Sequence, residues 1–250
     1  MHKNSWIALL LLLASCTPLV TATPLPTSQV VFLSFTPAFQ SWQETLQRCI
    51  ANTPGASFFV DDSSTAPVEI AAFNINFRLG LPTVKPQTPY YSAQIGWEKV
   101  TVVVNQANPA SSLSIEQLQG LFSGKIQYWH EILPTMARDV PVQAWAYLEG
   151  DEIRQAFEAA INPDDSLPLA ALLAPDPQAM AEAVSAHPGA IGYLPERWLE
   201  TYLGTDELKL KVMILDEQME ISLLLPVLAI SNEEPQGAAR ALLLCMQETE

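Results

Sequence analysis

The sequence predicts an α/β fold in which largely parallel sheets are flanked by helices. Segments of strand length alternate with segments of helical periodicity along most of the chain. The clearest strand candidate is 99–105 (KVTVVVN), which is β-branched and continuous. It and a second apolar strand candidate, 208–215, bracket a long middle block. A two-lobed chain that crosses into a second lobe and later returns has this pattern.

Each element has a local signal. Phe39, Trp42, Leu46 and Cys49 recur at helical spacing, and the stretch 114–117 (SIEQ) forms a capping-box pattern. Asp176 before Pro177 is typical of an N-cap followed by proline in the first turn. We expect strands at 29–35, 56–62, 68–75, 99–105, 141–147, 189–195, 208–215 and 224–231, and helices at 38–50, 115–124, 151–161, 177–187, 196–203 and 234–247.

Composition excludes some function classes. The net charge is −15, from 12 basic and 27 acidic residues, and the lysines are scattered without forming a basic patch. Nucleic-acid binding is therefore not expected. Hydrophobic residues make up 49% of the chain, enough to build a packed core despite 20 prolines.

The N-terminus has the layout of an export signal. Lys3 is followed by the apolar run 6–14, which is roughly half the length that a membrane-spanning helix needs. The following Cys16, with the stretch 13–16 (LASC), resembles the bacterial lipobox. We expect a signal peptide at 1–15, lipid attachment at Cys16, a proline-containing tether at 16–28, and an extracytoplasmic, membrane-anchored protein. The alternative is a buried helix that happens to contain a cysteine.

The two remaining cysteines, Cys49 and Cys245, leave two interpretations open. An exported protein permits a disulfide between them, and two separate buried thiols are equally compatible with the sequence. The three histidines are too dispersed to form a metal-ligand cluster, so neither a metal nor a cofactor is expected.

An enzyme is not expected either. The acidic pairs at 61–62 and 164–165 lie in Ser- or Pro-flanked turns that are typical of solvated loops. The sequence offers no nucleophile with an adjacent base and no glycine-rich nucleotide loop.

Three stretches resemble the phosphate-binding proteins of bacterial ABC importers. They are 102–132, which contains LFSGKI followed by Trp129, then 187–195 (HPGAIGYLP), and finally 224–246. The resemblance implies a type II periplasmic-binding-protein fold over 29–250, in which each lobe is a mainly parallel sheet flanked by helices. Lobe 1 would comprise 29–100 and 204–250, and lobe 2 would comprise 101–203. The ligand would lie between the lobes, and an importer permease would be a partner.

The resemblance also implies three segments that hold phosphate. The first supplies hydroxyls after the opening strand, here Ser34 and Thr36, although an ordinary loop with a capping threonine fits the same residues. In the second, the family's loop and helix are reduced to 60–67 (VDDSSTAP), and Asn74 stands where the family places an acceptor aspartate.

The third segment departs most from the family pattern Arg-x-Asp-Gly-Ser-Gly-Thr. In the matching stretch, 147–157, Tyr147 replaces the arginine and Gly150 is kept, but Asp151 and Glu152 replace hydroxyl and glycine positions. Two carboxylates repel an anion, and we expect Asp151 to cap its own helix with the N–H groups that a phosphate would need. Arg154 is expected to pair with Glu158.

These departures predict a solute-binding lipoprotein that holds a small molecule other than phosphate. The alternative is a degenerate binding fold that acts as a surface interaction module without a small ligand.

Overall fold

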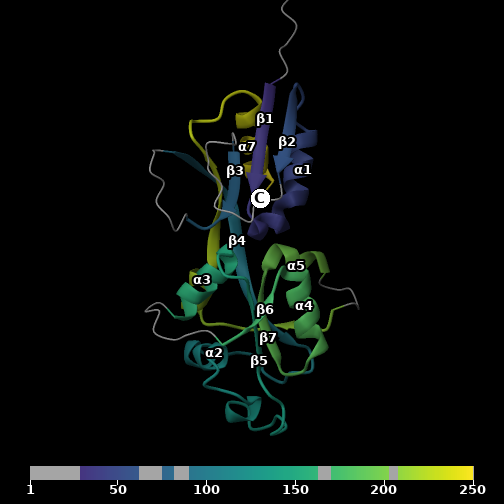
Figure 1. The fold of residues 1–250 in the computed structure, drawn as a ribbon, viewed down its shortest axis with the longest axis vertical. Coiled ribbons are helices and arrows are strands. Elements are labelled where there is room, and N and C mark those ends of the chain that lie inside the picture. The colour runs from purple at the N-terminus through teal and green to yellow at the C-terminus, as the bar shows by residue number, and fades with distance from the viewer. Residues whose placement is uncertain (1–28, 62–74, 82–89, 163–169, 203–207, 250) are drawn as a thin grey trace, which may run out of the picture.

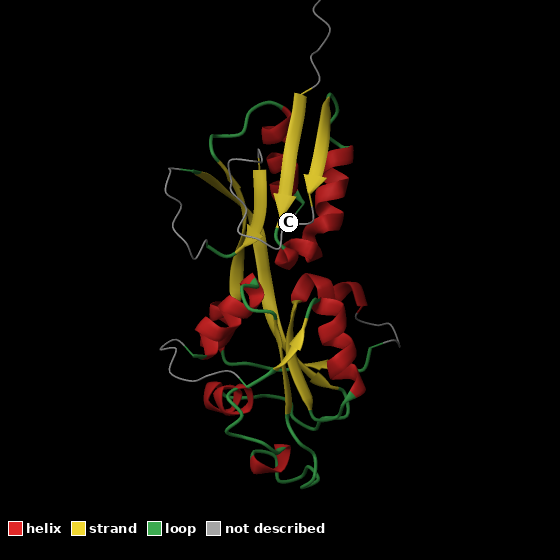
Figure 2. Ribbon diagram, viewed as in Figure 1, coloured by secondary structure: helices red, strands yellow, loops and turns green. Residues whose placement is uncertain are grey.

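The computed structural model describes residues 29–61, 75–81, 90–162, 170–202 and 208–249. They form two lobes arranged along the long axis of the molecule, with strand β4 running through both (Figure 1). Each lobe has a sheet with helices packed against it (Figure 2). The strands are β1 (Gln29–Phe35), β2 (Ala56–Asp61), β3 (Ile75–Leu79), β4 (Tyr91–Asn105), β5 (Gln143–Tyr147), β6 (Leu172–Ala174), β7 (Ala190–Pro195), β8 (Leu210–Val212) and β9 (Leu224–Ser231).

The helices connect these strands and cover the sheets. They are the 3-10 helices η1 (Pro37–Trp42) and η3 (Trp129–Glu131), and the α-helices α1 (Gln43–Ala51), α2 (Ile115–Phe122), α3 (Glu152–Ile161), α4 (Pro177–Ala186), α5 (Glu196–Tyr202), α6 (Glu217–Ser222) and α7 (Ala238–Glu248).

The strand order is β2-β1-β3-β9-β4-β7-β5-β6, with β8 also paired to β4. In lobe 1, β9 runs antiparallel to β3 and β4, while β2, β1 and β3 pair in parallel. In lobe 2, β4 runs antiparallel to β7 and β8, while β7, β5 and β6 pair in parallel. One strand therefore opposes the others in each lobe, which confirms the predicted mainly parallel sheets of a type II fold.

Strand β4 is the main connection between the lobes. Its first part pairs with β9 as far as Lys99, and its second part pairs with β7 from Val100 onward. The lobes therefore meet at residues 98–100. Strand β8 lies beside Val103–Asn105, in the lobe 2 part of β4. We therefore propose that the chain returns to lobe 1 with β9, later than the boundary at residue 204 that the sequence suggests.

Aromatic side chains fill both cores. In lobe 1, Phe39 stacks on Phe77 with ring centroids 5.1 Å apart. In lobe 2, Phe157 stacks on Tyr193 with centroids 3.9 Å apart. A disulfide with an S–S distance of 2.06 Å joins Cys49 of α1 to Cys245 of α7. Of the two interpretations that the sequence left open, the structure has the disulfide.

Several elements differ from their predicted bounds. The helix predicted at 38–50 is divided into η1 and α1, and the strand predicted at 208–215 is confined to β8, followed by the unpredicted helix α6. The last helix begins at Ala238, because the preceding Gly237 has a φ of 58° that breaks the helical backbone. Most of the strand predicted at 68–75 lies outside the described residues.

The predicted signal peptide at 1–15, Cys16 and the tether at 16–28 also lie outside the described residues. Within the described ranges, the helices are too short or too polar for any of them to cross a membrane.

Candidate ligand site between the lobes

The carboxyl ends of three strands meet where the two lobes face each other. Thr36 follows β1 and precedes η1, whereas Arg78 and Leu79 end β3. Glu152 is the first residue of α3, which follows β5 in lobe 2. Ligands of open α/β sheets bind outside the carboxyl ends of strands, so this junction is the candidate site.

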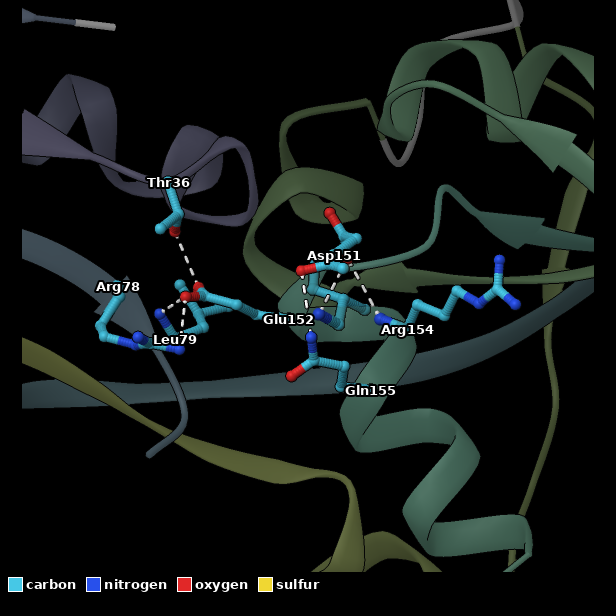
Figure 3. A network of polar contacts seen from close by, with 9 residues as sticks. Thr36, Arg78, Leu79, Asp151, Glu152, Arg154 and Gln155 are labelled. Atoms are coloured by element: carbon cyan, nitrogen blue, oxygen red, sulfur yellow. Dashed lines mark hydrogen bonds and ion pairs between the residues drawn. The ribbon is translucent and has the colours of Figure 1, made fainter. Parts of the chain in front are cut away.

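The carboxylate of Glu152 crosses from lobe 2 into lobe 1 (Figure 3). Its Oε2 accepts hydrogen bonds from Thr36 Oγ1 at 2.7 Å and from the Leu79 backbone N–H at 2.8 Å. Its Oε1 lies 2.8 Å from a terminal nitrogen of Arg78. We call these three donors the lobe 1 cradle. In this structure the cradle holds a carboxylate that belongs to the protein itself.

The backbone explains how the cradle forms. Strand β1 pairs with β3 only as far as Phe77, so β3 extends past the end of its neighbour. This extension leaves the Leu79 N–H directed at the carboxylate, beside the hydroxyl of Thr36 (Figure 3). Thr36 is held in turn, because its own N–H donates to the carbonyl of Phe77 at 3.1 Å.

Burial controls the charge of the site. The side chains of Glu152 and Arg78 are 8% and 18% exposed. Desolvation raises the pKa of Glu152 to about 7, although Arg78, Thr36 and the Leu79 N–H favour the ionised form. The nearby charge of Asp151 also raises this pKa. The site therefore contains one partly buried cation facing a buried carboxyl group that titrates near neutral pH.

Asp151 caps helix α3, as predicted. Its Oδ1 accepts from the N–H groups of Ile153 at 2.8 Å and Arg154 at 3.1 Å. Burial raises the pKa of Asp151, and these two N–H groups lower it. The helix N-terminus is therefore already occupied by a carboxylate, which leaves these N–H groups unavailable to an external anion.

Other predicted site residues make contacts outside the cradle or serve the backbone. Ser34 is buried, and its Oγ accepts from the side-chain amide of Asn76 at 2.8 Å. Tyr147 is 1% exposed, packs edge-on against Tyr193 and belongs to the lobe 2 core. Gly150, at a φ of 90°, forms the turn before Asp151. Asn74 lies outside the described residues.

Arg154 does not enter the site. Its guanidinium pairs with Glu158 at 2.6 Å, as predicted, and also donates to the carbonyl of Tyr147 at 2.9 Å. Figure 3 shows the side chain running away from the carboxylate of Glu152.

Two cradle members, Arg78 and Leu79, were not predicted from the sequence. A backbone N–H carries no signal in the sequence. Arg78 does carry one, because it is a charged residue within a mainly apolar strand of a chain with few basic residues. A charge at such a position requires a buried partner.

A second buried glutamate also joins the lobes. Glu98 of β4 accepts hydrogen bonds from Trp42 Nε1 at 2.7 Å and Ser41 Oγ at 2.9 Å in lobe 1. Its other oxygen accepts from the Arg197 N–H at the start of α5 in lobe 2. The guanidinium of Arg197 lies 3.9 Å from the Trp42 ring centroid. Burial raises the pKa of Glu98, partly offset by these donors.

The described residues contain no group of three or more His, Cys, Asp or Glu side chains placed to hold a metal ion.

The sequence profile of the PBP superfamily domain matches residues 78–231, which is more than half of the chain. The protein therefore belongs to the PBP superfamily. A search of curated protein sequences gives no match.

Solved structures show the same fold at low sequence identity. One is described as a phosphate ABC transporter substrate-binding protein with bound phosphate, from Clostridium perfringens. It is 16% identical, with a TM-score of 0.70, over 87% of this chain and 93% of the other. An ABC-type phosphate transport receptor from Vibrio cholerae is also 16% identical, with a TM-score of 0.65, over 88% and 94% of the two chains.

The fold also occurs outside transport. The reduced regulatory domain of OxyR2 from Vibrio vulnificus matches with a TM-score of 0.62 and 12% identity, over 90% of this chain and 97% of the other. The chain thus shares its fold with phosphate ABC substrate-binding proteins and with a regulatory domain. The fold alone does not determine which solute, if any, is bound.

Proposed function

We propose that this protein is an extracytoplasmic solute-binding lipoprotein, anchored through Cys16, that binds a small molecule other than phosphate between its lobes. An ABC importer permease is the expected partner, by analogy with the structural relatives described as transport proteins. No enzymatic activity is proposed.

One observation supports the exclusion of phosphate. The carboxylate of Glu152 already bonds to Thr36, Arg78 and Leu79, and Asp151 lies beside it. A phosphate in this position would have to displace one carboxylate and face another. Like charges about 4 Å apart repel by roughly 4 kcal/mol at the effective dielectric of a site near a protein surface.

The test of solute binding is a thermal-shift screen of the purified protein against anions, amino acids, sugars and cations. A ligand at one hundred times its Kd stabilises the folded state by about 2.7 kcal/mol, which raises the melting temperature by several degrees. We expect a solute to produce this shift and phosphate to produce none at 1 mM. A shift with micromolar phosphate would contradict the proposal.

The anchor has its own test. The C16S variant should appear in the soluble fraction, whereas the wild-type protein should sediment with membranes. If C16S stays with the membranes, lipidation of this cysteine is not what holds the protein there.

A second function, an interaction module without a small ligand, is favoured by one exposed feature. Phe32 of β1 and Phe59 of β2 stack on the outer face of the lobe 1 sheet, 45% and 56% exposed. Exposed apolar groups of this kind mark protein interaction surfaces. This alternative predicts that no solute in the screen shifts the melting temperature.

A further inference from the structure

The lobe 1 cradle is complementary to a single carboxylate group. Two neutral donors, the Thr36 hydroxyl and the Leu79 N–H, converge on one oxygen of Glu152, and the Arg78 guanidinium faces the other oxygen. One positive charge thus meets one negative charge. Charge-assisted bonds of this type are shorter and stronger than neutral ones.

The cradle also has a donor that Glu152 does not use. The Nε of Arg78 is buried and has no hydrogen-bond partner within the described ranges. A guanidinium binds a carboxylate best through two parallel N–H···O bonds. The contact from Arg78 to Glu152 involves one terminal nitrogen of the guanidinium. A carboxylate that is not tethered to α3 has the freedom to align with both nitrogens.

The charge around the cradle limits the ligand class. With Glu152 withdrawn, the charged groups that act on its position, among the residues that the structure describes, are Arg78, from β3, and Asp151, at the start of α3. One cation and one anion leave no surplus positive charge to balance a dianion such as phosphate at neutral pH. A bound monoanionic carboxylate gives the site the same net charge as the ionised side chain of Glu152.

We propose that the lobe 1 cradle is a binding site for the carboxylate group of a solute, and that Glu152 is a tethered occupant which this carboxylate displaces as the lobes open. The proposal rests on the proposed solute-binding function for the identity of the displacing molecule. The cradle itself is tested separately, on a variant that lacks the tethered occupant.

A solute carboxylate can displace Glu152 because the ionised side chain is only weakly stabilised in the cradle. Its pKa of about 7 shows that desolvation of the ionised carboxylate outweighs the stabilisation it receives from Arg78, Thr36 and Leu79. A solute carboxylate also loses water on binding, but it gains the second nitrogen of Arg78 and any contacts made by the rest of the solute.

The test uses E152A, with acetate and formate as small carboxylate probes and inorganic phosphate and chloride as comparison anions, in a buffer free of carboxylates. The proposal predicts that acetate at ten times its Kd raises the melting temperature of E152A by about 3–5 °C. The wild-type protein and the control E158A, which loses a partly exposed carboxylate paired with Arg154 on the same helix, should not respond. The double variant T36V/E152A should respond less than E152A.

As a second measurement, refolding yields of E152A are compared in acetate and in chloride. This comparison tests the cradle even if E152A does not fold in chloride. Recovery in acetate alone supports the cradle, and failure in both contradicts it. An equal or larger response to phosphate overturns the carboxylate assignment. If E152A responds to acetate while wild type responds to no solute, the cradle stands and the solute-binding function fails. If wild type binds a solute while E152A ignores carboxylates, only the cradle proposal fails.

Discussion

The hydroxyl of Thr36 donates to the carboxylate of Glu152 at 2.7 Å across the interface between the lobes, although 116 positions separate the two residues in the chain. Relatives of this fold close over ligands by hinge motion between lobes. Here the same interface is bridged by side chains of the protein. The bridge places a protein carboxylate among the donors that an anionic ligand would use.

The ion pair between Arg78 and Glu152 predicts a large effect of removing the cation. R78M removes the charge partner of Glu152, whose carboxyl then takes up a proton near neutral pH, and leaves its buried oxygen without this donor. We expect the free energy of unfolding to fall by about 1–3 kcal/mol. Urea unfolding followed by circular dichroism measures this. The control R48M removes an exposed arginine paired with Glu44 and should change stability by less than about 1 kcal/mol. Equal effects of the two substitutions would show that the pair of Arg78 and Glu152 stabilises the protein no more than an exposed ion pair does.

The raised pKa of Glu152 predicts a pH dependence of known sign. Its ordinary pKa is 4.5 and its folded-state pKa is about 7, so the folded state binds the proton more tightly than the unfolded state. The resulting stability is fully present below pH 4.5 and is lost as the pH rises through 7.

The variant E152Q isolates the contribution of Glu152 and its coupling to Asp151, because the other titrating groups, Glu98 included, are present in both proteins. The unfolding free energy of wild type relative to E152Q should fall by about 3 kcal/mol between pH 4.5 and pH 8. A difference that stays constant, or that rises with pH, would mean that Glu152 is ionised throughout this range.

Glu98 predicts a second effect on the contact between lobes. In E98Q, an amide N–H₂ replaces one of the two acceptor oxygens that face Trp42, Ser41 and the Arg197 N–H. An unsatisfied buried donor costs about 1–3 kcal/mol. Urea unfolding followed by tryptophan fluorescence, to which the buried Trp42 beside Glu98 contributes, measures the change. E44Q is the control, since Glu44 is 85% exposed. If E98Q changes the free energy of unfolding no more than E44Q does, the contacts of Glu98 do not stabilise the interface between the lobes.

The disulfide between Cys49 and Cys245 predicts sensitivity to reduction. It links residues 196 positions apart, and constraining so long a loop in the unfolded chain corresponds to about 5 kcal/mol in the chain-entropy model. The double variant C49A/C245A should unfold at clearly lower urea concentration than wild type, and thiol titration of denatured wild type should detect neither cysteine as free. Two reactive thiols in the oxidised protein would contradict the bond.

The parts of this structure that the sequence predicts are those with local causes. The apolar run of β1 lies where expected, the capping box at Ser114 starts α2, and Asp151 caps α3 with its side chain. Thr36 and Glu152 were each identified from a family pattern. Their direct contact was not, because a hydrogen bond across two lobes depends on the hinge geometry of β4 and not on any local sequence.

Arg78 and Leu79 were missed for a related reason. The expected site residue was Asn74, within a strand predicted at 68–75, whereas the described strand β3 runs from Ile75 to Leu79. The site therefore uses the end of a strand that continues to Leu79, past the end at residue 75 that the sequence pattern suggested. Tyr147 is the opposite case. The family resemblance implied that it is a site residue, but in the structure it is buried in the core.

Isothermal titration of phosphate into the wild-type protein at pH 7.5 is the sharpest test of the proposal that Glu152 occupies the anion site. If Glu152 holds this position, no binding heat is expected up to 1 mM phosphate. A one-to-one isotherm with a micromolar Kd would contradict it, because it would show that phosphate readily displaces the carboxylate of Glu152.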